Sequence, residues 1–169
     1  MKQLLPGIWQ WSWFSEEKQL DFVIDMPAEP IVLPSDRRAL SQILINLIGN
    51  AIKFTDAGAV RVALARRPNR LLPGIAAENE DRYSLVFCIA DTGIGIRPED
   101  QARLFREFGR VDSATVRSRE GTGLGLRLSQ RLTEVLGGVI TVQSEYGVGS
   151  TFTIVFPEES YDTGAHHRG

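Results

Sequence analysis

The chain has 169 residues, of which 43% are apolar and 24% charged, the size and balance of a single soluble globular domain. Its net charge of −2 argues against nucleic-acid binding through a broad basic surface, and its single cysteine excludes an internal disulfide. No apolar run is long enough to cross a bilayer, so we expect a soluble, cytoplasmic domain, alone or as part of a larger membrane protein.

The first third of the chain predicts a helix, a strand and then a long buried helix. Residues 8–19 have the apolar side of an amphipathic helix, and residues 20–26 alternate as a strand does. The long helix is predicted over residues 36–54, with Ser35 or Asp36 as its N-cap. Its apolar positions follow the helical period: Leu40, Ile43, Leu44, Leu47, Ile48 and Ala51.

The middle of the chain predicts two strands joined by a long loop. Val60, Val62 and Leu64 alternate with other residues, which is typical of a strand. Residues 66–82 contain prolines, a glycine and mixed charge without a clean period, so they predict a loop. "YSLVFCIAD" is apolar on both faces, which indicates a strand in the centre of the sheet.

The last part of the chain predicts one more helix and a hairpin. Residues 92–122 are rich in glycine and charge, with one short helical patch, and residues 124–136 predict an amphipathic helix. "GGVITVQSE" and "GSTFTIVFP" predict a closing hairpin. Because helices and strands are segregated, we expect a two-layer α/β sandwich, a mixed sheet covered on one face by helices.

A polar stripe runs along the most apolar helix. Asn46, Asn50 and Lys53 are four and three positions apart in "NLIGNAIKF", which places them on one helix face. An amide oxygen is a hard ligand that suits Mg²⁺, and a lysine one turn away can reach phosphate oxygens. The stripe therefore predicts the floor of a nucleotide-phosphate site, and a solvated helix face is the alternative.

"DTGIGI" follows the predicted central strand. Asp91 ends that strand, and Gly93 and Gly95 come directly after it. A carboxylate there can accept a hydrogen bond from an exocyclic amine such as that of adenine, while glycines allow the backbone to approach the ring. A tight turn with aspartate as turn former is the alternative interpretation.

"GTGLGL" lies where a glycine-rich segment meets a predicted helix. Backbone N–H groups and the helix dipole at such a point favour phosphate. The segment is not a Walker A loop, because no lysine follows the last glycine. Leu126 stands where a dinucleotide fingerprint needs its third glycine. The alternative is a glycine hinge without a ligand.

"LFREFGR" carries two phenylalanines three positions apart, Phe105 and Phe108. Such a pair is commonly part of a core. Here it stands in the least regular and most charged segment, which favours a lid whose aromatic residues dock when a ligand is present.

The order and spacing of these four motifs resemble the ATP-binding catalytic domain of bacterial sensor histidine kinases, within the gyrase, Hsp90, histidine kinase and MutL superfamily. The resemblance runs from about residue 16 to residue 157. It implies a Bergerat-type fold with a flexible ATP lid, a catalytic domain over residues 1–157 and a disordered tail over residues 158–169. It also implies ATP and Mg²⁺ as cofactors and, for the full protein, a membrane-anchored sensor as one possibility.

The resemblance implies a role for each residue of the first two motifs. Asn50 ligates Mg²⁺, Asn46 lines the same phosphate site, and Lys53 contacts phosphate. Phe54 packs beside the nucleotide. Asp91 binds the adenine amine with the help of a water, and the glycines of its loop, Gly93 and Gly95, allow that approach.

The resemblance places the remaining residues in the lid. Phe105 and Phe108 belong to it, and Arg110 is a candidate for the γ-phosphate. The glycines let the lid fold over the phosphates, with weaker assignments for two neighbours in the same region; these residues are Gly121, Thr122, Gly123, Leu124 and Gly125.

Asn46 separates branches of the superfamily. In the ATP-hydrolysing branches the corresponding position resembles a glutamate that activates water, whereas an amide cannot act as a general base. An enzyme that passes its phosphoryl group to a protein benefits from leaving water inactive. Catalysis then depends on positioning and charge neutralisation by Mg²⁺, Lys53 and Arg110.

The phosphoacceptor expected of the family is missing from this sequence. Its histidines are His166 and His167, in a polar tail without a helical context. The expected partner is therefore a histidine-containing dimerisation domain, in the same full-length protein or in trans, with a response regulator acting downstream. The isolated domain is expected to be monomeric. One alternative is an anti-sigma-like regulatory binding module, although the complete lid motifs favour the kinase. Another is a degenerate domain that no longer binds ATP, and the intact Asn50, Asp91 and glycine motifs argue against it.

Overall fold

A computed structural model describes residues 16–29, 31, 35–72, 82–105 and 125–158. Its elements, in chain order, are β1 (Asp21–Asp25), α2 (Arg37–Phe54), β2 (Ala59–Pro68), the short 3-10 helix η1 (Asn69–Leu71), β3 (Tyr83–Asp91), α3 (Pro98–Gln101), α5 (Gly125–Val135), β4 (Val139–Glu145) and β5 (Gly149–Pro157). In the described part of the chain, no helix is long and apolar enough to span a bilayer.

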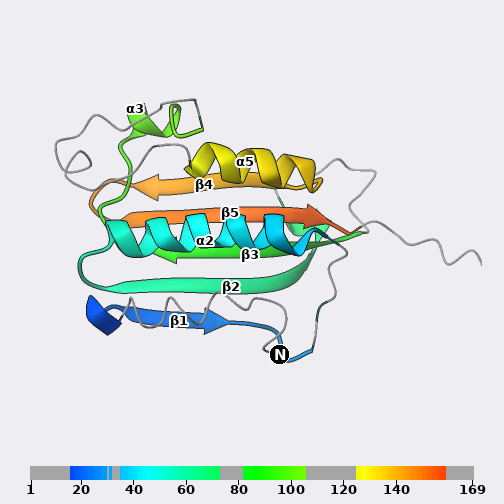
Figure 1. Cartoon of the computed structure of the whole chain (residues 1–169), viewed down its shortest axis with the longest axis horizontal. Helices are drawn as coiled ribbons and strands as arrows, with labels where there is room; N and C mark the ends of the chain where they lie inside the picture. Colours follow the sequence, from blue (N-terminus) through cyan, green and yellow to red (C-terminus); the bar gives the residue numbers. More distant parts are fainter. Residues whose placement is uncertain (1–15, 30, 32–34, 73–81, 106–124, 159–169) are drawn as a thin grey trace, which may run out of the picture.

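The strands form one mixed sheet of five strands in the order β1-β2-β3-β5-β4. β1 pairs with β2 in parallel, and the other pairs are antiparallel. Figure 1 shows α2 and α5 lying along the sheet on the same side. The predicted two-layer α/β sandwich is therefore confirmed, and β3 occupies the central position that its apolar character on both faces predicts.

The core lies between α2 and the sheet. Ile43, Leu47 and Ile48 of α2 are fully buried. On the sheet, the side chains that meet them come from alternate positions of neighbouring strands and are equally buried: Val60, Val62, Ile89 and Ile154. This burial explains the helical period of the α2 sequence, since one helix face has to match one face of the pleated sheet.

The boundaries of α2 agree closely with the prediction. Asp36 is the N-cap, and its Oδ1 accepts hydrogen bonds from the backbone N–H groups of Arg38 at 2.7 Å and Ala39 at 3.2 Å. The predicted strand over residues 20–26 and the predicted helix over residues 124–136 are also present, as β1 and α5. The predicted helix over residues 8–19 lies almost wholly outside the described residues.

The predicted loop over residues 66–82 is wrong at its start. β2 continues to Pro68, and η1 follows directly. The Arg66 guanidinium stacks 4.2 Å from the ring centroid of Tyr83 and donates to the Glu158 carboxylate through Nε and Nη2. These contacts stabilise an arginine within the strand. Buried Asn69 ends the segment, where its Oδ1 accepts a 2.6 Å hydrogen bond from Ser84.

Candidate functional site

The polar stripe of α2 lies on a partly exposed face of the helix, close to its carboxyl end. Asn46, Asn50, Lys53 and Phe54 are all half-buried, in contrast to the fully buried apolar positions between them. The Lys53 ammonium lies 5.3 Å from the centroid of the Phe54 ring. The structure thus brings two amides, an ammonium and an aromatic ring together at one helix end.

The two asparagines have different surroundings. Asn46 Nδ2 donates to the carbonyl of Gly125 and to Ser129 Oγ, both at 3.3 Å, and its Oδ1 accepts from Gln42 at 3.0 Å. Asn46 therefore connects α2 to the first turn of α5, where the fourth motif ends. Asn50 lies one turn after Asn46 on the same helix face and is half-buried.

Asp91 lies at the end of β3 on the helix-covered face of the sheet. Its strand partners are Val60 and Ser150, and it follows buried Ile89 by two positions, which puts both side chains on the same face. Its Oδ1 accepts a 2.8 Å hydrogen bond from the backbone N–H of Gly93. Burial raises the pKa of the Asp91 carboxyl, and hydrogen bonds from the Gly93 and Ser150 backbones offset part of that rise.

The loop after Asp91 is packed too tightly for side chains at its glycines. A Cβ atom on Gly93 would lie 2.3 Å from the carbonyl oxygen of Phe54, which also accepts a 3.2 Å hydrogen bond from Ile94 N. Gly95 has a φ of +66°, and a Cβ there would lie 2.0 Å from the carbonyl oxygen of Glu145. The loop therefore holds Asp91 between the end of α2 and the β4–β5 hairpin, as glycine alone permits.

Polar residues that the sequence analysis did not single out anchor this loop. Ser144 Oγ accepts from the backbone of Ile96 at 2.8 Å and donates to the carbonyl of Gly149 at 3.0 Å. Gln101 donates to the carbonyls of Ile96 and Ser144 at 3.1 and 2.9 Å. The sequence does not predict the bonds from Ile96 to Ser144 and from Gln101 to Ser144, because they join residues more than forty positions apart.

Part of the predicted lid is described. Phe105 is half-buried against the core, and Gly125 begins α5 with its Cα facing the Asn46 amide. The other predicted lid residues lie outside the described residues: Phe108, Arg110, Gly121, Thr122, Gly123 and Leu124. The structure thus brings Asn46 and Gly125 together, and it describes the fourth motif only from Gly125 onward.

A metal at this site would need ligands from the nucleotide as well as from the protein. Among the described residues no cluster of three or more histidine, cysteine, aspartate or glutamate side chains is placed to hold a metal ion. Asn46 and Asn50 offer neutral amide oxygens, and that of Asn46 already accepts a hydrogen bond from Gln42. Mg²⁺ commonly takes one or two protein oxygens, several waters and substrate phosphates, so the residues present fit Mg²⁺ carried by a polyphosphate.

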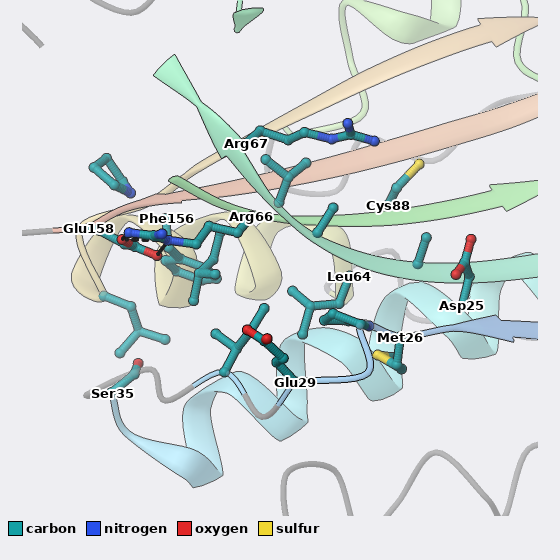
Figure 2. Close-up of a pocket in the computed structure, with 18 of the residues that line it drawn as sticks. Asp25, Met26, Glu29, Ser35, Leu64, Arg66, Arg67, Cys88, Phe156 and Glu158 are labelled. Atoms are coloured by element: carbon teal, nitrogen blue, oxygen red, sulfur yellow. Dashed lines mark hydrogen bonds and ion pairs between the residues drawn. The ribbon is translucent and has the colours of Figure 1, made fainter. Parts of the chain in front are cut away.

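A large hollow lies elsewhere on the molecule. Figure 2 shows it beside Arg66, Glu158, Cys88 and Asp25. Its volume is about 1290 Å³. None of the candidate site residues that the structure describes lines it. We assign the candidate site to the end of α2 and the Asp91 loop because the chemistry converges there, and size alone does not identify a ligand site.

Comparison with known sequences gives a consistent picture. Residues 35–160 match the family described as histidine kinase-, DNA gyrase B-, and HSP90-like ATPase. Hybrid signal transduction histidine kinase B of Dictyostelium discoideum is 40% identical over 144 residues, which are 83% of this chain and 7% of that protein. Sensor histidine kinase AruS of Pseudomonas aeruginosa is 45% identical over 132 residues, 76% of this chain and 12% of that protein. The chain therefore spans a small part of the length of these relatives.

Solved structures agree. Full-length ShkA in complex with AMPPNP has a TM-score of 0.67 at 31% identity, covering 86% of this chain and 27% of the ShkA chain. The nucleotide-free catalytic domain of histidine kinase ThkA has a TM-score of 0.66 at 24% identity, covering 88% of this chain and 86% of that one, and shows the fold alone. The five-stranded mixed sheet with its helices is thus a Bergerat-like α/β fold.

Proposed function

Since the chain belongs to the histidine kinase-, DNA gyrase B- and HSP90-like ATPases, the family that its four motifs predict, we propose that it binds Mg-ATP and supplies the γ-phosphoryl group to a histidine on a separate domain in two-component signal transduction. One observation carries the proposal. The hydrogen bond from Ile94 N–H to the carbonyl of Phe54 joins the loop after Asp91, the proposed adenine contact, to the end of α2, which carries the proposed Mg²⁺ ligand Asn50. This connection supports placing one nucleotide between Asp91 and Asn50.

Each described residue has a role in this proposal. The Asp91 carboxylate accepts a hydrogen bond from the adenine amine, and Gly93 and Gly95 let the ring approach the backbone. Asn50 offers its oxygen to Mg²⁺, which neutralises charge on the phosphates when bound. Lys53 contacts phosphate, and Phe54 packs beside the nucleotide.

We assign the closing of the site to the third and fourth motifs. Phe105 and Phe108 dock when nucleotide is present, and Arg110 contacts the γ-phosphate. Gly121, Thr122, Gly123, Leu124 and Gly125 supply backbone N–H groups and freedom of conformation around the phosphates.

Asn46 favours transfer to a protein over hydrolysis. Its Nδ2 is occupied by the Gly125 carbonyl and Ser129, and an amide has no basic lone pair that could activate water. The chemical step breaks the bond between the β,γ-bridging oxygen and the γ-phosphorus and forms a bond from a histidine nitrogen to that phosphorus, with ADP leaving. The chain contributes position and charge, which dominate phosphoryl transfer.

The acceptor and its setting are part of the same proposal. The acceptor histidine belongs to a dimerisation domain, in the same full-length protein or in trans, and a response regulator takes the phosphoryl group from it. The ATP-binding domain spans residues 1–157, acts in the cytoplasm and is monomeric when isolated. The curated relatives support this setting through their names, hybrid and sensor histidine kinases.

The function is tested by titrating the full chain with Mg-ATP in a calorimeter and then mixing it with radiolabelled ATP and a histidine-containing dimerisation domain. We expect one binding site and acid-labile label on the histidine domain. Nucleotide binding without any transfer would favour a nucleotide-dependent regulatory module of the same superfamily. Label on this chain alone would contradict the proposed acceptor.

Asn50→Ala is expected to remove the Mg²⁺ dependence of binding. Loss of one protein oxygen ligand should weaken Mg-ATP binding about tenfold, equivalent to about 1.4 kcal/mol. Binding of ATP in the presence of EDTA should stay within twofold, because the adenine contact is untouched. Gln42→Ala is a matched control, since Gln42 lies on the same helix face about two turns before Asn50, bonds to Asn46 and has no metal role. Equal Mg²⁺ dependence of ATP binding in wild type and Asn50→Ala would mean that Asn50 is not a ligand of the metal.

A further inference from the structure

The carboxyl end of α2 is held by donors from outside the helix. The last four carbonyl groups of any helix lack partners within it. Thr55 Oγ1 donates to the carbonyl of Ala51 at 2.7 Å. The Lys18 ammonium donates to the carbonyls of Ile52 at 2.9 Å and Lys53 at 3.3 Å. Three of the four carbonyls are thus satisfied by side chains, two of them by one residue that precedes β1.

The remaining carbonyl connects the helix to the Asp91 loop. The Phe54 oxygen accepts from Ile94 N at 3.2 Å. Lys18 makes a third bond, to the carbonyl of Thr55 at 3.2 Å, so it holds the residues on either side of Phe54. Loss of the Lys18 contacts should therefore shift the Phe54 carbonyl, which joins the end of α2 to the Asp91 loop.

Lys18 substitutes for the usual end of a helix. Many helices end in a left-handed glycine whose N–H bonds back to the last turn. Here the C-cap, Thr55, is extended with φ −110° and ψ 118°, so that motif is absent. An ammonium has three donors, which match the three carbonyls that Lys18 contacts, and its charge complements the negative end of the helix dipole.

The chain adopts a strained backbone next to Lys18. Gln19 has a φ of +55°, and its N–H donates to the carbonyl of Glu16 at 3.0 Å, closing a tight turn before β1. A glutamine rarely adopts this conformation, and such positions persist where the surroundings fix them. The turn leads straight into β1, the strand that pairs with β2, so Lys18 reaches α2 from a rigid base.

We propose that Lys18 is a positioning residue of the ATP site, a role that rests on the proposed function. By neutralising and bonding the carbonyls of the last turn of α2, Lys18 keeps Lys53 and Phe54 in helical geometry. Without it those carbonyls turn towards water and the last turn frays. Lys53 is then no longer held in position to contact phosphate, and the bond between the Phe54 carbonyl and the Asp91 loop is weakened.

The test is Lys18→Met in the full chain, with Lys18→Arg as the conservative variant and Arg37→Met as the control. Arg37 is an exposed cation at the opposite end of the same helix. The measurements are the calorimetric Kd for Mg-ATP at 25 °C, where each variant is verified to be folded, and amide hydrogen exchange over residues 50–55. We expect Lys18→Met to weaken Mg-ATP binding about tenfold and to speed exchange in the last turn. Lys18→Arg should stay within about threefold, since its guanidinium keeps the charge and the donors.

The outcomes separate the two proposals. Wild-type chain that does not bind Mg-ATP overturns the proposed function. Wild-type binding with an unchanged Kd in folded Lys18→Met overturns the positioning role, because a purely structural contact lowers the melting temperature without changing the affinity of the folded chain. A loss in Lys18→Arg as large as in Lys18→Met overturns the role of charge. If Lys18→Met does not fold, Lys18→Gln, which keeps N–H donors without the charge, takes its place; an unchanged Kd in the folded Lys18→Gln chain would overturn the role of the charge.

Discussion

Asp91→Asn is expected to abolish detectable Mg-ATP binding, a loss of at least about 100-fold, or roughly 2.7 kcal/mol. The Asp91 carboxylate already accepts hydrogen bonds from the backbones of Gly93 and Ser150, and the proposed adenine amine adds another donor. An asparagine has one acceptor oxygen and one donor nitrogen, so a donor would then face a donor. Calorimetry with Mg-ATP measures the loss directly.

The same substitution is expected to leave the nucleotide-free chain at least as stable as wild type at pH 7. Burial raises the pKa of Asp91, so its ionised form is less favourable in the folded than in the unfolded chain. A raised carboxyl pKa means that the folded chain binds the proton more tightly, and stability falls as pH rises through the range just above 3.8. Asparagine carries no charge, so the variant should not lose stability in this way as the pH rises. Thermal melts from pH 4 to pH 7 test this.

Asp21→Asn is the control for Asp91→Asn. Asp21 is an exposed carboxylate on the edge strand β1, away from the candidate site, so its neutralisation should leave Mg-ATP binding unchanged. If Asp91→Asn bound Mg-ATP within threefold of wild type, the adenine contact would have to lie elsewhere. If Asp91→Asn unfolded, the loss of binding would report stability instead of recognition.

The sequence predicts those elements whose reasons are local. The start of α2 is readable because an aspartate cap precedes an apolar period, and the structure begins the helix one residue after that cap. The central place of β3 is readable because apolar residues on both faces of a strand are typical of the middle of a sheet. The four motifs are readable because their residue types and their order together are unusual.

What the sequence does not predict depends on contacts between distant segments. "RRP" at residues 66–68 has the composition of a loop, yet it continues β2, because Glu158 and Tyr83 hold the Arg66 side chain across the sheet. Lys18 similarly stands in a charged turn whose composition indicates only exposure to solvent. Its partners are backbone carbonyl groups more than thirty positions away. Every residue has such a group, so the residue types do not indicate the contact.

Gly95→Ala is expected to destabilise the chain by about 3 kcal/mol and to weaken Mg-ATP binding at least about tenfold. Two costs combine at this position. A left-handed φ of +66° penalises any Cβ by about 1 kcal/mol or more, and the new atom would overlap the backbone of Glu145 and Tyr146. Backbone atoms cannot rotate away as a side chain can, so the Asp91 loop has to leave the hairpin. Urea denaturation and calorimetry measure the two effects.

Gly147→Ala separates strain from collision. Gly147 lies in the neighbouring hairpin turn with a φ of +84°, and among the described residues no atom lies within 4 Å of its added Cβ. It therefore carries the conformational penalty without the overlap, and we expect a loss of about 1 kcal/mol with unchanged affinity. Its N–H still donates to the carbonyl of Ile94 at 2.8 Å, which keeps the loop attached. Equal losses in both variants would mean that backbone strain alone, and not the close approach of loop and hairpin, makes glycine necessary at Gly95.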